Sequence, residues 1–211
     1  MSADVNNHSP NDSNPLGRHD LEVIASWIRP GERILDLGCG DGALLKYLRE
    51  EKGVLGYGVE VNPAKVLAAI ANGVNVIQID LEQGLVGFDD AQFNHVVMSL
   101  SLQAVQNTER LLREMLRVGR EAVVSFPNFG YRKHREAIAV GRMPVSETLP
   151  YQWYNTPNVR FFTIADFDAL CAERGIEIRD RRAFDEQGRP VTDDLNLNGS
   201  IAVYRLARQS A

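Results

Sequence analysis

The chain has 211 residues, of which 44% are hydrophobic and 24% are charged, and its formal net charge at pH 7 is −5. This balance is typical of a globular protein and excludes collagen-like, disordered and membrane-spanning chains. The excess of acidic residues argues against binding to nucleic acid or to an anionic membrane.

The N-terminal residues and the two cysteines indicate the cellular compartment in which we expect the protein. Residues 1–17 are rich in Asn, Ser and Pro and contain no apolar core of a signal peptide, so we expect a flexible tail there. Cys39 and Cys171 lie far apart and lack the spacing of metal ligands. This predicts reduced thiols in a cytoplasmic protein without a metal site. Residues 18–211 are long enough for one domain with a single sizeable core.

Helix and strand signals alternate from residue 19 to residue 126. Apolar residues at helical spacing predict helices at 19–28 and after Gly42. Asn62 can cap a helix that starts at Pro63, and Thr108 can cap another that stops near Gly119. Strands are predicted at 33–37, 56–61, 74–79, 93–100 and 122–126. Such alternation is typical of βαβ units, whose parallel sheet is covered by helices on both faces.

The pattern breaks after Pro127 and resumes at about Thr163. Because a stretch of this length inside a compact domain is usually functional or partly helical, we expect 127–163 to be an insertion that forms a lid or a partner-binding segment. A helix at 165–174 and two closing strands at 176–183 and 200–206 follow. The predicted fold is therefore α/β and Rossmann-like, with a mostly parallel sheet of seven strands.

A glycine-rich loop follows the first strand and leads into a helix. Gly38, Gly40 and Gly42 let the backbone approach a ligand closely, and the helix end offers unpaired N–H groups. Asp36 precedes the loop and Asp41 lies within it. Carboxylates at these positions are unfavourable beside a diphosphate, whereas they suit a ligand that carries an ammonium and a sulfonium.

Two more acids end the next strands. Glu60 ends the second strand, where a carboxylate can accept ribose hydroxyls, and Asp80 ends the third, where one can receive an adenine amino group. Ligands of open α/β sheets bind at this edge. Two other interpretations stay open: a nicotinamide dinucleotide site, since Ala43 completes the dinucleotide pattern, or a structural turn with surface acids.

This order of motifs resembles class I S-adenosylmethionine-dependent methyltransferases over residues 18–126 and the last strands. The resemblance implies that the glycine loop with Asp36 surrounds the methionine portion, that Glu60 binds the ribose, and that Asp80 with Leu81 lies near the adenine. Ser101 would line the pocket after the fourth strand. The residues expected to hold S-adenosylmethionine or S-adenosylhomocysteine are Asp36, Gly38, Cys39, Gly40, Asp41, Gly42, Glu60, Val61, Asp80, Leu81, Ser99 and Leu100.

The second half resembles the methionine biosynthesis protein MetW. The residues that carry this resemblance, which runs over 18–206, lie at 102–105, 117–130, 141–158 and 162–176. It implies a methyltransferase-like protein that works with MetX, a homoserine O-acyltransferase. We therefore expect an accessory or regulatory subunit. The competing hypothesis is a true methyltransferase acting on a small metabolite or a protein, and a nicotinamide-binding protein is a third.

No residue type and spacing in the chain defines a catalytic group. His134 is the one histidine expected near the open end of the sheet, where it would be a proton acceptor or a solvated loop residue. Cys39 is better explained as a small residue that fits the glycine loop than as a nucleophile.

Residues 131–154 combine arginines with aromatic side chains. These residue types are enriched at interface hot spots, and a lid could use them too. The alternative is an aromatic cluster that plugs one end of the sheet beside a solvated basic helix. The residues expected to contact a partner or form the lid are Arg132, Arg135, Tyr151, Trp153 and Tyr154.

Overall fold

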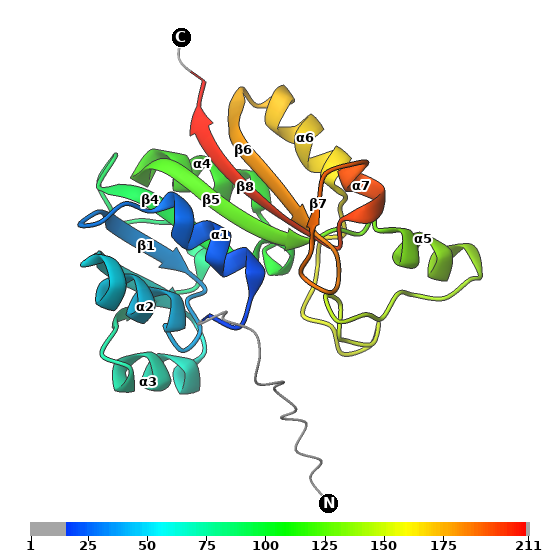
Figure 1. Cartoon of the computed structure of the whole chain (residues 1–211). Coiled ribbons are helices and arrows are strands. Elements are labelled where there is room, and N and C mark those ends of the chain that lie inside the picture. The colour runs from blue at the N-terminus through cyan, green and yellow to red at the C-terminus, as the bar shows by residue number, and fades with distance from the viewer. Residues whose placement is uncertain (1–15, 210–211) are drawn as a thin grey trace, which may run out of the picture.

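A computed structural model describes residues 16–209 of the chain (Figure 1). The tail expected at 1–17 falls almost wholly outside the described residues. The strands are β1 (Arg33–Leu37), β2 (Leu55–Glu60), β3 (Asn75–Gln78), β4 (Phe93–Ser99), β5 (Gly119–Pro127), β6 (Ile176–Phe184), β7 (Pro190–Val191) and β8 (Ile201–Arg208). The helices are α1 (His19–Trp27), α2 (Ala43–Lys52), α3 (Pro63–Ala71), α4 (Thr108–Val118), α5 (Arg132–Ala139), α6 (Ile164–Glu173) and α7 (Leu195–Asn198), with short 3-10 turns η1 (Leu81–Gln83) and η2 (Leu102–Ala104).

The strands form one sheet in the order β3-β2-β1-β4-β5-β8-β6-β7. The first five in this order are parallel, and β8 runs antiparallel between β5 and β6. The described sheet thus has eight strands, one more than expected. The extra strand is β7, which is two residues long and folds back on β6 through a turn in which Gly188 donates its N–H to the Asp185 carbonyl. A strand of two residues is too short to show an apolar pattern in the sequence.

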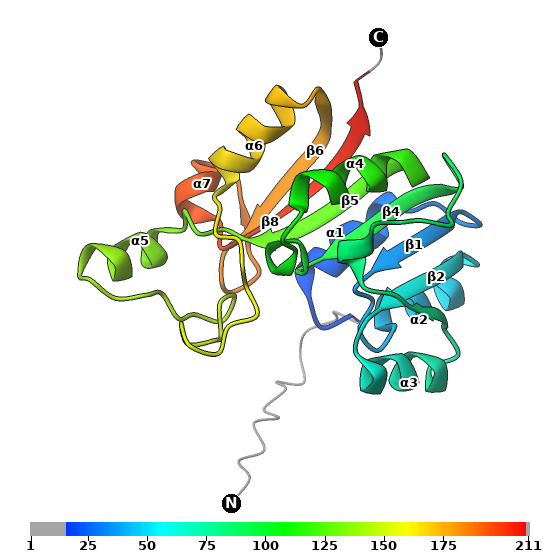
Figure 2. The same cartoon turned by 180° about the vertical axis from the view of Figure 1, so that it is seen from behind.

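Helices cover both faces of the sheet, as predicted. The helices α1, α2 and α3 lie on the face seen in Figure 1, and α4 and α6 lie on the face seen in Figure 2. Each face has its own buried cluster: Ile24, Leu48 and Val97 belong to the first, and Phe126 and Phe167 belong to the second. Because β1 and β4 are largely buried between the two helical layers, a ligand can reach these strands at their ends and not on their faces.

The caps of the helices show how local sequence sets their starts. Asn62 accepts hydrogen bonds from the N–H groups of Ala64 and Lys65 ahead of Pro63, as predicted. Thr108 is not the cap of α4, because Asn107 takes that position and the Thr108 hydroxyl donates to the Val105 carbonyl. The expected helix starts are therefore correct within one residue.

The segment 127–163 contains α5 and otherwise runs as turns and extended chain. Its two ends meet at the buried Asn128. The side-chain oxygen of Asn128 accepts from the N–H groups of Gly130 and Ile164, and its amide nitrogen donates to the carbonyls of Asn196 and Gly199. One side chain thus holds both ends of the segment against the C-terminal part of the domain.

Within residues 16–209, no helix is long and apolar enough to cross a membrane. The same residues contain no group of three or more His, Cys, Asp or Glu side chains placed to hold a metal ion.

Candidate functional site

The glycine loop lies where β1 ends and α2 begins. Gly38 and Cys39 both donate their N–H groups to the Val59 carbonyl, at 2.7 and 3.1 Å, which ties the loop to β2. Gly38 has a φ of +72°, and a Cβ there would lie 2.9 Å from the Ser101 hydroxyl oxygen. A Cβ on Gly40, in contrast, would meet nothing within 4 Å. The loop therefore packs tightly at Gly38 and leaves open space at Gly40.

Glu60 is buried at the end of β2 and holds the loop from the side. Its Oε2 accepts from the Gly40 N–H at 3.0 Å, and its Oε1 accepts from the N–H groups of Val61 and Asn62 at 3.0 and 2.9 Å. A carboxylate has about four acceptor positions, so three are taken and room is left for one ligand hydroxyl. Glu60 therefore shapes the glycine loop and retains one free acceptor position.

Asp36 is a buried carboxyl in the middle of this site. Burial raises its pKa from 3.8 to about 7, the guanidinium of Arg18 lowers it, and the charge of Glu60 raises it further. Parallel pairing puts Asp36 beside Gly58, two residues before Glu60. Asp36 therefore lies in a region of low dielectric beside a second buried acid, and its ionisation is unfavourable unless a positive charge comes close.

Cys39 packs against the backbone of β2. A Cβ on Gly58 would lie 2.4 Å from the Cys39 sulfur, so the thiol fills the space that this glycine leaves. Burial raises the pKa of the Cys39 thiol to about 12, and the charges of Asp36 and Glu60 act in the same direction. A thiol that stays protonated is a poor nucleophile, which agrees with its interpretation as a small packing residue.

The other acids expected at the site lie at its rim. Asp41 is exposed, and its Oδ1 accepts from the Ala43 N–H at 3.2 Å, just ahead of α2, whose N-cap residue is Gly42. Asp80 is exposed, and its Oδ1 accepts from the Glu82 N–H at 3.0 Å. Val61 is exposed and Leu81 half-buried, as expected for residues at the mouth of a site.

A buried polar network next to this site was missed by the sequence analysis. Asp20, the second residue of α1, is buried and accepts from the hydroxyls of Ser99 and Ser125 at 2.9 and 2.7 Å. It also forms an ion pair with Arg18 at 2.6 Å. The network binds α1 to the ends of β4 and β5, and it places Arg18 close enough to act on Asp36. An acid in a first helical turn is so common that the sequence alone does not single out Asp20.

The residue that follows β4, Leu100, has a strained backbone conformation. Leu100 has a φ of +47°, which costs a non-glycine residue on the order of 1–3 kcal/mol. Its N–H donates to the carbonyl and the hydroxyl of Ser125, and its carbonyl accepts from the Gln103 amide at 2.7 Å. Strain of this kind is often found at ligand sites, and Leu100 was among the residues expected there.

A cavity of about 490 Å³ opens beside Leu100. It lies at the ends of β4 and β5 and is lined by residues from α1, the 147–158 stretch and the turn after β6. The side chain of His19 lines it, so His134 is not the one histidine near the open end, contrary to the sequence analysis. The polar residues among its lining are Arg18, His19, Asp20, Gln103, Glu147, Thr148, Tyr151, Asn158, Asp185 and Glu186.

His134 is buried on α5 rather than solvated in a loop. Its Nδ1 lies 2.9 Å from the Asn128 carbonyl oxygen and its Nε2 lies 2.8 Å from the Ser146 hydroxyl. Burial lowers the pKa of His134. The two ring nitrogens of His134 therefore link Asn128, at the start of the segment, to Ser146. This structural role accounts for a buried histidine at this position without a catalytic function.

The aromatic residues of the segment do not plug the sheet. Trp153 and Tyr154 are 72% and 70% exposed and contact each other edge to face, and Tyr151 is 48% exposed. Arg132 and Arg135 are also exposed, and the Arg135 guanidinium donates to the carbonyls of Gly130 and Asn196. All five residues expected at a lid or interface are thus exposed, and Arg135 also stabilises the segment itself.

Comparison with known proteins gives one family. The sequence model of the family described as methionine biosynthesis protein MetW matches residues 18–206. The bifunctional methionine biosynthesis protein MetXA/MetW of Rhodopirellula baltica is 41% identical over 204 residues, which cover 90% of this chain. The chain spans 33% of the length of that relative.

Several solved structures with the same fold are methyltransferases by name. The structure of a putative methyltransferase with the Haloferax volcanii Trm112 activator has a TM-score of 0.68 at 16% identity, covering 91% of this chain and 90% of that one. An S-adenosylmethionine-dependent methyltransferase from Mesorhizobium loti has a TM-score of 0.67 at 19% identity, covering 91% and 99%. At such identities the likeness shows a shared fold, the Rossmann-like class I methyltransferase fold, and no more.

Proposed function

Because the chain belongs to the methionine biosynthesis protein MetW family, we propose that it binds S-adenosylmethionine or S-adenosylhomocysteine and acts as an accessory subunit of the homoserine O-acyltransferase MetX. The ligand lies at the carboxyl ends of β1 to β4. Its occupancy adjusts the activity of the acyltransferase, which requires the ligand to favour one partner-binding state over another.

The pair of buried acids, Asp36 and Glu60, carries the first half of this proposal. In the protein without a ligand, Arg18 is the cation that stabilises ionised Asp36. The ammonium and sulfonium groups of S-adenosylmethionine would add further positive charge near this carboxylate. The diphosphate of a nicotinamide dinucleotide would instead place more negative charge beside both acids. The donor and acceptor chemistry of the residues present therefore fits the sulfonium ligand better.

The other residues fit the remaining parts of this ligand. The methionine portion passes the open side of Gly40, and one ribose hydroxyl takes the acceptor position left on Glu60. The adenine lies between Val61 and Leu81, where the second oxygen of Asp80 can accept from its amino group. Ser99 and Leu100 close the site on the β4 side.

The fused relative supports the second half of the proposal. Its name joins MetXA and MetW in one chain, which brings the two units together by covalent linkage. In this chain the exposed side chains of Trp153, Tyr154 and Arg132 are the surface we propose for MetX. Both thiols are free and buried, which suits a reducing compartment, and we propose that the protein works in the cytoplasm.

A true methyltransferase is the second candidate. The 490 Å³ cavity beside Leu100 favours it, because a methyl acceptor placed there would lie next to the ligand that we propose. Methyl transfer from a sulfonium needs chiefly positioning of the acceptor, so the lack of an evident base does not oppose this function.

Thermal unfolding with S-adenosylmethionine, S-adenosylhomocysteine and NAD tests the ligand. A ligand at 100 times its dissociation constant adds about 2.7 kcal/mol to the free energy of unfolding. We expect this from the first two compounds, and we expect its loss in Asp36→Asn but not in the exposed control Asp89→Asn. Stabilisation by NAD alone, or full binding by Asp36→Asn, would refute the assignment.

Copurification with MetX tests the partner surface. We expect Trp153→Ala and Arg132→Ala to weaken the complex, whereas Leu67→Ala, an exposed change on α3, leaves it intact. Unchanged complexes in the first two variants would reject this surface. Transfer of a labelled methyl group to a small molecule or protein of the extract would instead establish the second candidate function.

A further inference from the structure

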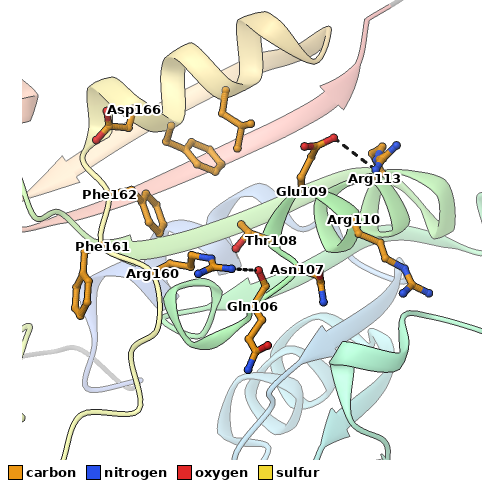
Figure 3. A pocket seen from close by; sticks show the side chains of 12 residues that line it. Gln106, Asn107, Thr108, Glu109, Arg110, Arg113, Arg160, Phe161, Phe162 and Asp166 are labelled. Carbon is orange, nitrogen blue, oxygen red and sulfur yellow. Dashed lines mark hydrogen bonds and ion pairs between the residues drawn. The ribbon is translucent and has the colours of Figure 1, made fainter. Parts of the chain in front are cut away.

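A second cavity, of about 500 Å³, lies on the other face of the sheet, between α4 and α6 (Figure 3). None of the residues proposed above for S-adenosylmethionine lines it. Its walls come from the start of α4, from residues 160–162 and from the first two turns of α6. Its volume is in the range of pockets that hold small molecules.

One wall of this cavity is apolar. Phe167 is buried and Phe162 is half-buried, and their ring centroids lie 6.1 Å apart. Leu170 extends this wall by one further turn of α6, and the half-exposed Phe161 stands at its edge. Such a wall favours the apolar body of a ligand over a hydrated ion.

The opposite side carries positive charge. Arg160 donates to the carbonyls of Gln106 and Val159, and Arg110 donates to the carbonyl of Gln83. Across residues 16–209, no carboxylate forms an ion pair with either arginine. Figure 3 shows Arg160 between the phenylalanines and Thr108 at the first turn of α4.

The acids around the cavity are already compensated. Glu109 pairs with Arg113 at 3.5 Å and with Arg174 at 3.1 Å. Asp166 accepts from the N–H and the hydroxyl of Thr163, in the capping box of α6. Arg110 lies close enough to Glu114 for its charge to lower the pKa of that acid. The cavity therefore combines an aromatic wall with Arg160, whose guanidinium forms no ion pair within residues 16–209.

We propose that this cavity binds a small organic anion with an apolar body. A carboxylate or phosphate group pairs with Arg160 beside the first turn of α4, and the body lies on Phe162, Phe167 and Leu170. Arginine suits this role because its planar guanidinium donates two parallel hydrogen bonds to such an anion.

The cavity is joined to the proposed cofactor site through Gln103. The backbone N–H groups of Val159 and Arg160 donate to the Gln103 carbonyl, at 2.9 and 3.0 Å, and the Gln103 amide donates to the Leu100 carbonyl. An anion bound to Arg160 would therefore shift Gln103 and, through the hydrogen bond of its amide, the backbone of Leu100, which closes the proposed cofactor site. This consequence, unlike the binding itself, rests on the proposed function.

Phenyl phosphate is a suitable probe, since it combines an aromatic body with an anionic group. We expect its titration to shift the NMR signals of Thr108, Arg160 and Phe162 in a saturable way. Inorganic phosphate and benzyl alcohol, which each keep one half of the probe, should bind at least about tenfold more weakly. Scattered shifts, or equal binding of inorganic phosphate, would overturn the proposal.

Substitutions of Arg160 test whether its positive charge holds the anionic group of phenyl phosphate. Arg160→Gln should weaken phenyl phosphate about tenfold, and Arg160→Lys should keep part of the affinity because it keeps the charge. Arg142→Gln, which removes an exposed arginine from another part of the segment, should leave binding unchanged. Equal loss in Arg160→Gln and Arg142→Gln would show a diffuse charge effect and refute the site. These measurements need no S-adenosylmethionine, so failure of the proposed function would leave their outcome unaffected.

Discussion

Replacing Asp36 by asparagine should make the unliganded protein more stable, although it removes a residue from the proposed site. In the folded protein the pKa of Asp36 is raised from 3.8 to about 7, mainly by burial. The folded state therefore binds a proton more tightly than the unfolded state does. Below about pH 4 both states are protonated and burial of this group costs nothing through ionisation.

The loss of stability caused by burying ionised Asp36 grows as the pH rises from about 4 to about 7. Above about pH 7 the carboxyl is ionised in both states, and the full difference of about three pKa units applies. At 1.36 kcal/mol for each unit, this amounts to about 4 kcal/mol of lost stability. Asparagine stays neutral throughout, so the stability of Asp36→Asn relative to the wild type should rise between pH 4 and pH 7 and then level off.

Urea unfolding of both proteins at intervals from pH 5 to pH 8.5 measures this difference. The amide of asparagine brings its own packing and hydrogen-bonding effects, but these add a constant that does not vary with pH. The slope is thus the informative quantity. A stability difference that stays flat across this range would refute the view that Asp36 is a carboxyl whose ionisation is opposed by burial.

Three further outcomes follow from the contacts described above. Calorimetry should show S-adenosylmethionine binding up to about tenfold more weakly for each pH unit below 7, because the cationic ligand requires ionised Asp36, and the exposed control Asp89→Asn should show the same trend. Gly58→Ala should lose about 1–3 kcal/mol in chemical unfolding, since its Cβ would overlap the sulfur of Cys39, and Cys39→Ala should restore part of that loss; simple additivity of the two changes would contradict this contact. Asp20→Ala should lose about 3–5 kcal/mol in thermal unfolding, because Ser99 and Ser125 lose their shared acceptor in the interior, and a loss below 1 kcal/mol would show that the network is dispensable.

The sheet and the glycine loop at the end of β1 were predictable because their sequence signals are local, whereas the binding of a ligand there stays a prediction. The short apolar strand that contains Asp36 and the glycine loop after it can be recognised within nine residues, 34–42, and Asn62-Pro63 marks a helix start with two residues. Periodicity placed the bounds of the parallel strands within three residues of those observed, and those of β1 without any difference. The family resemblance set the order of these elements in space.

The interior contacts were not predictable, since they join residues far apart in the chain. Asp20 meets Ser125 across 105 positions, and neither residue type draws attention in its own segment. His134 was misplaced because a histidine between basic residues suggests a solvated surface, whereas its partners at 128 and 146 are visible only in the fold. The two-residue β7 is too short for any periodic signal.

Asn128 allows the segment that follows it to change in sequence and length with little effect on the rest of the domain. Its side chain fixes the points at which residues 127–163 leave and rejoin the domain, whatever lies between them. Since the entropy of closing a loop depends only weakly on its length, insertions and deletions inside the segment would disturb the sheet very little. Natural selection could therefore remodel this surface while the sheet and the glycine loop keep their shape.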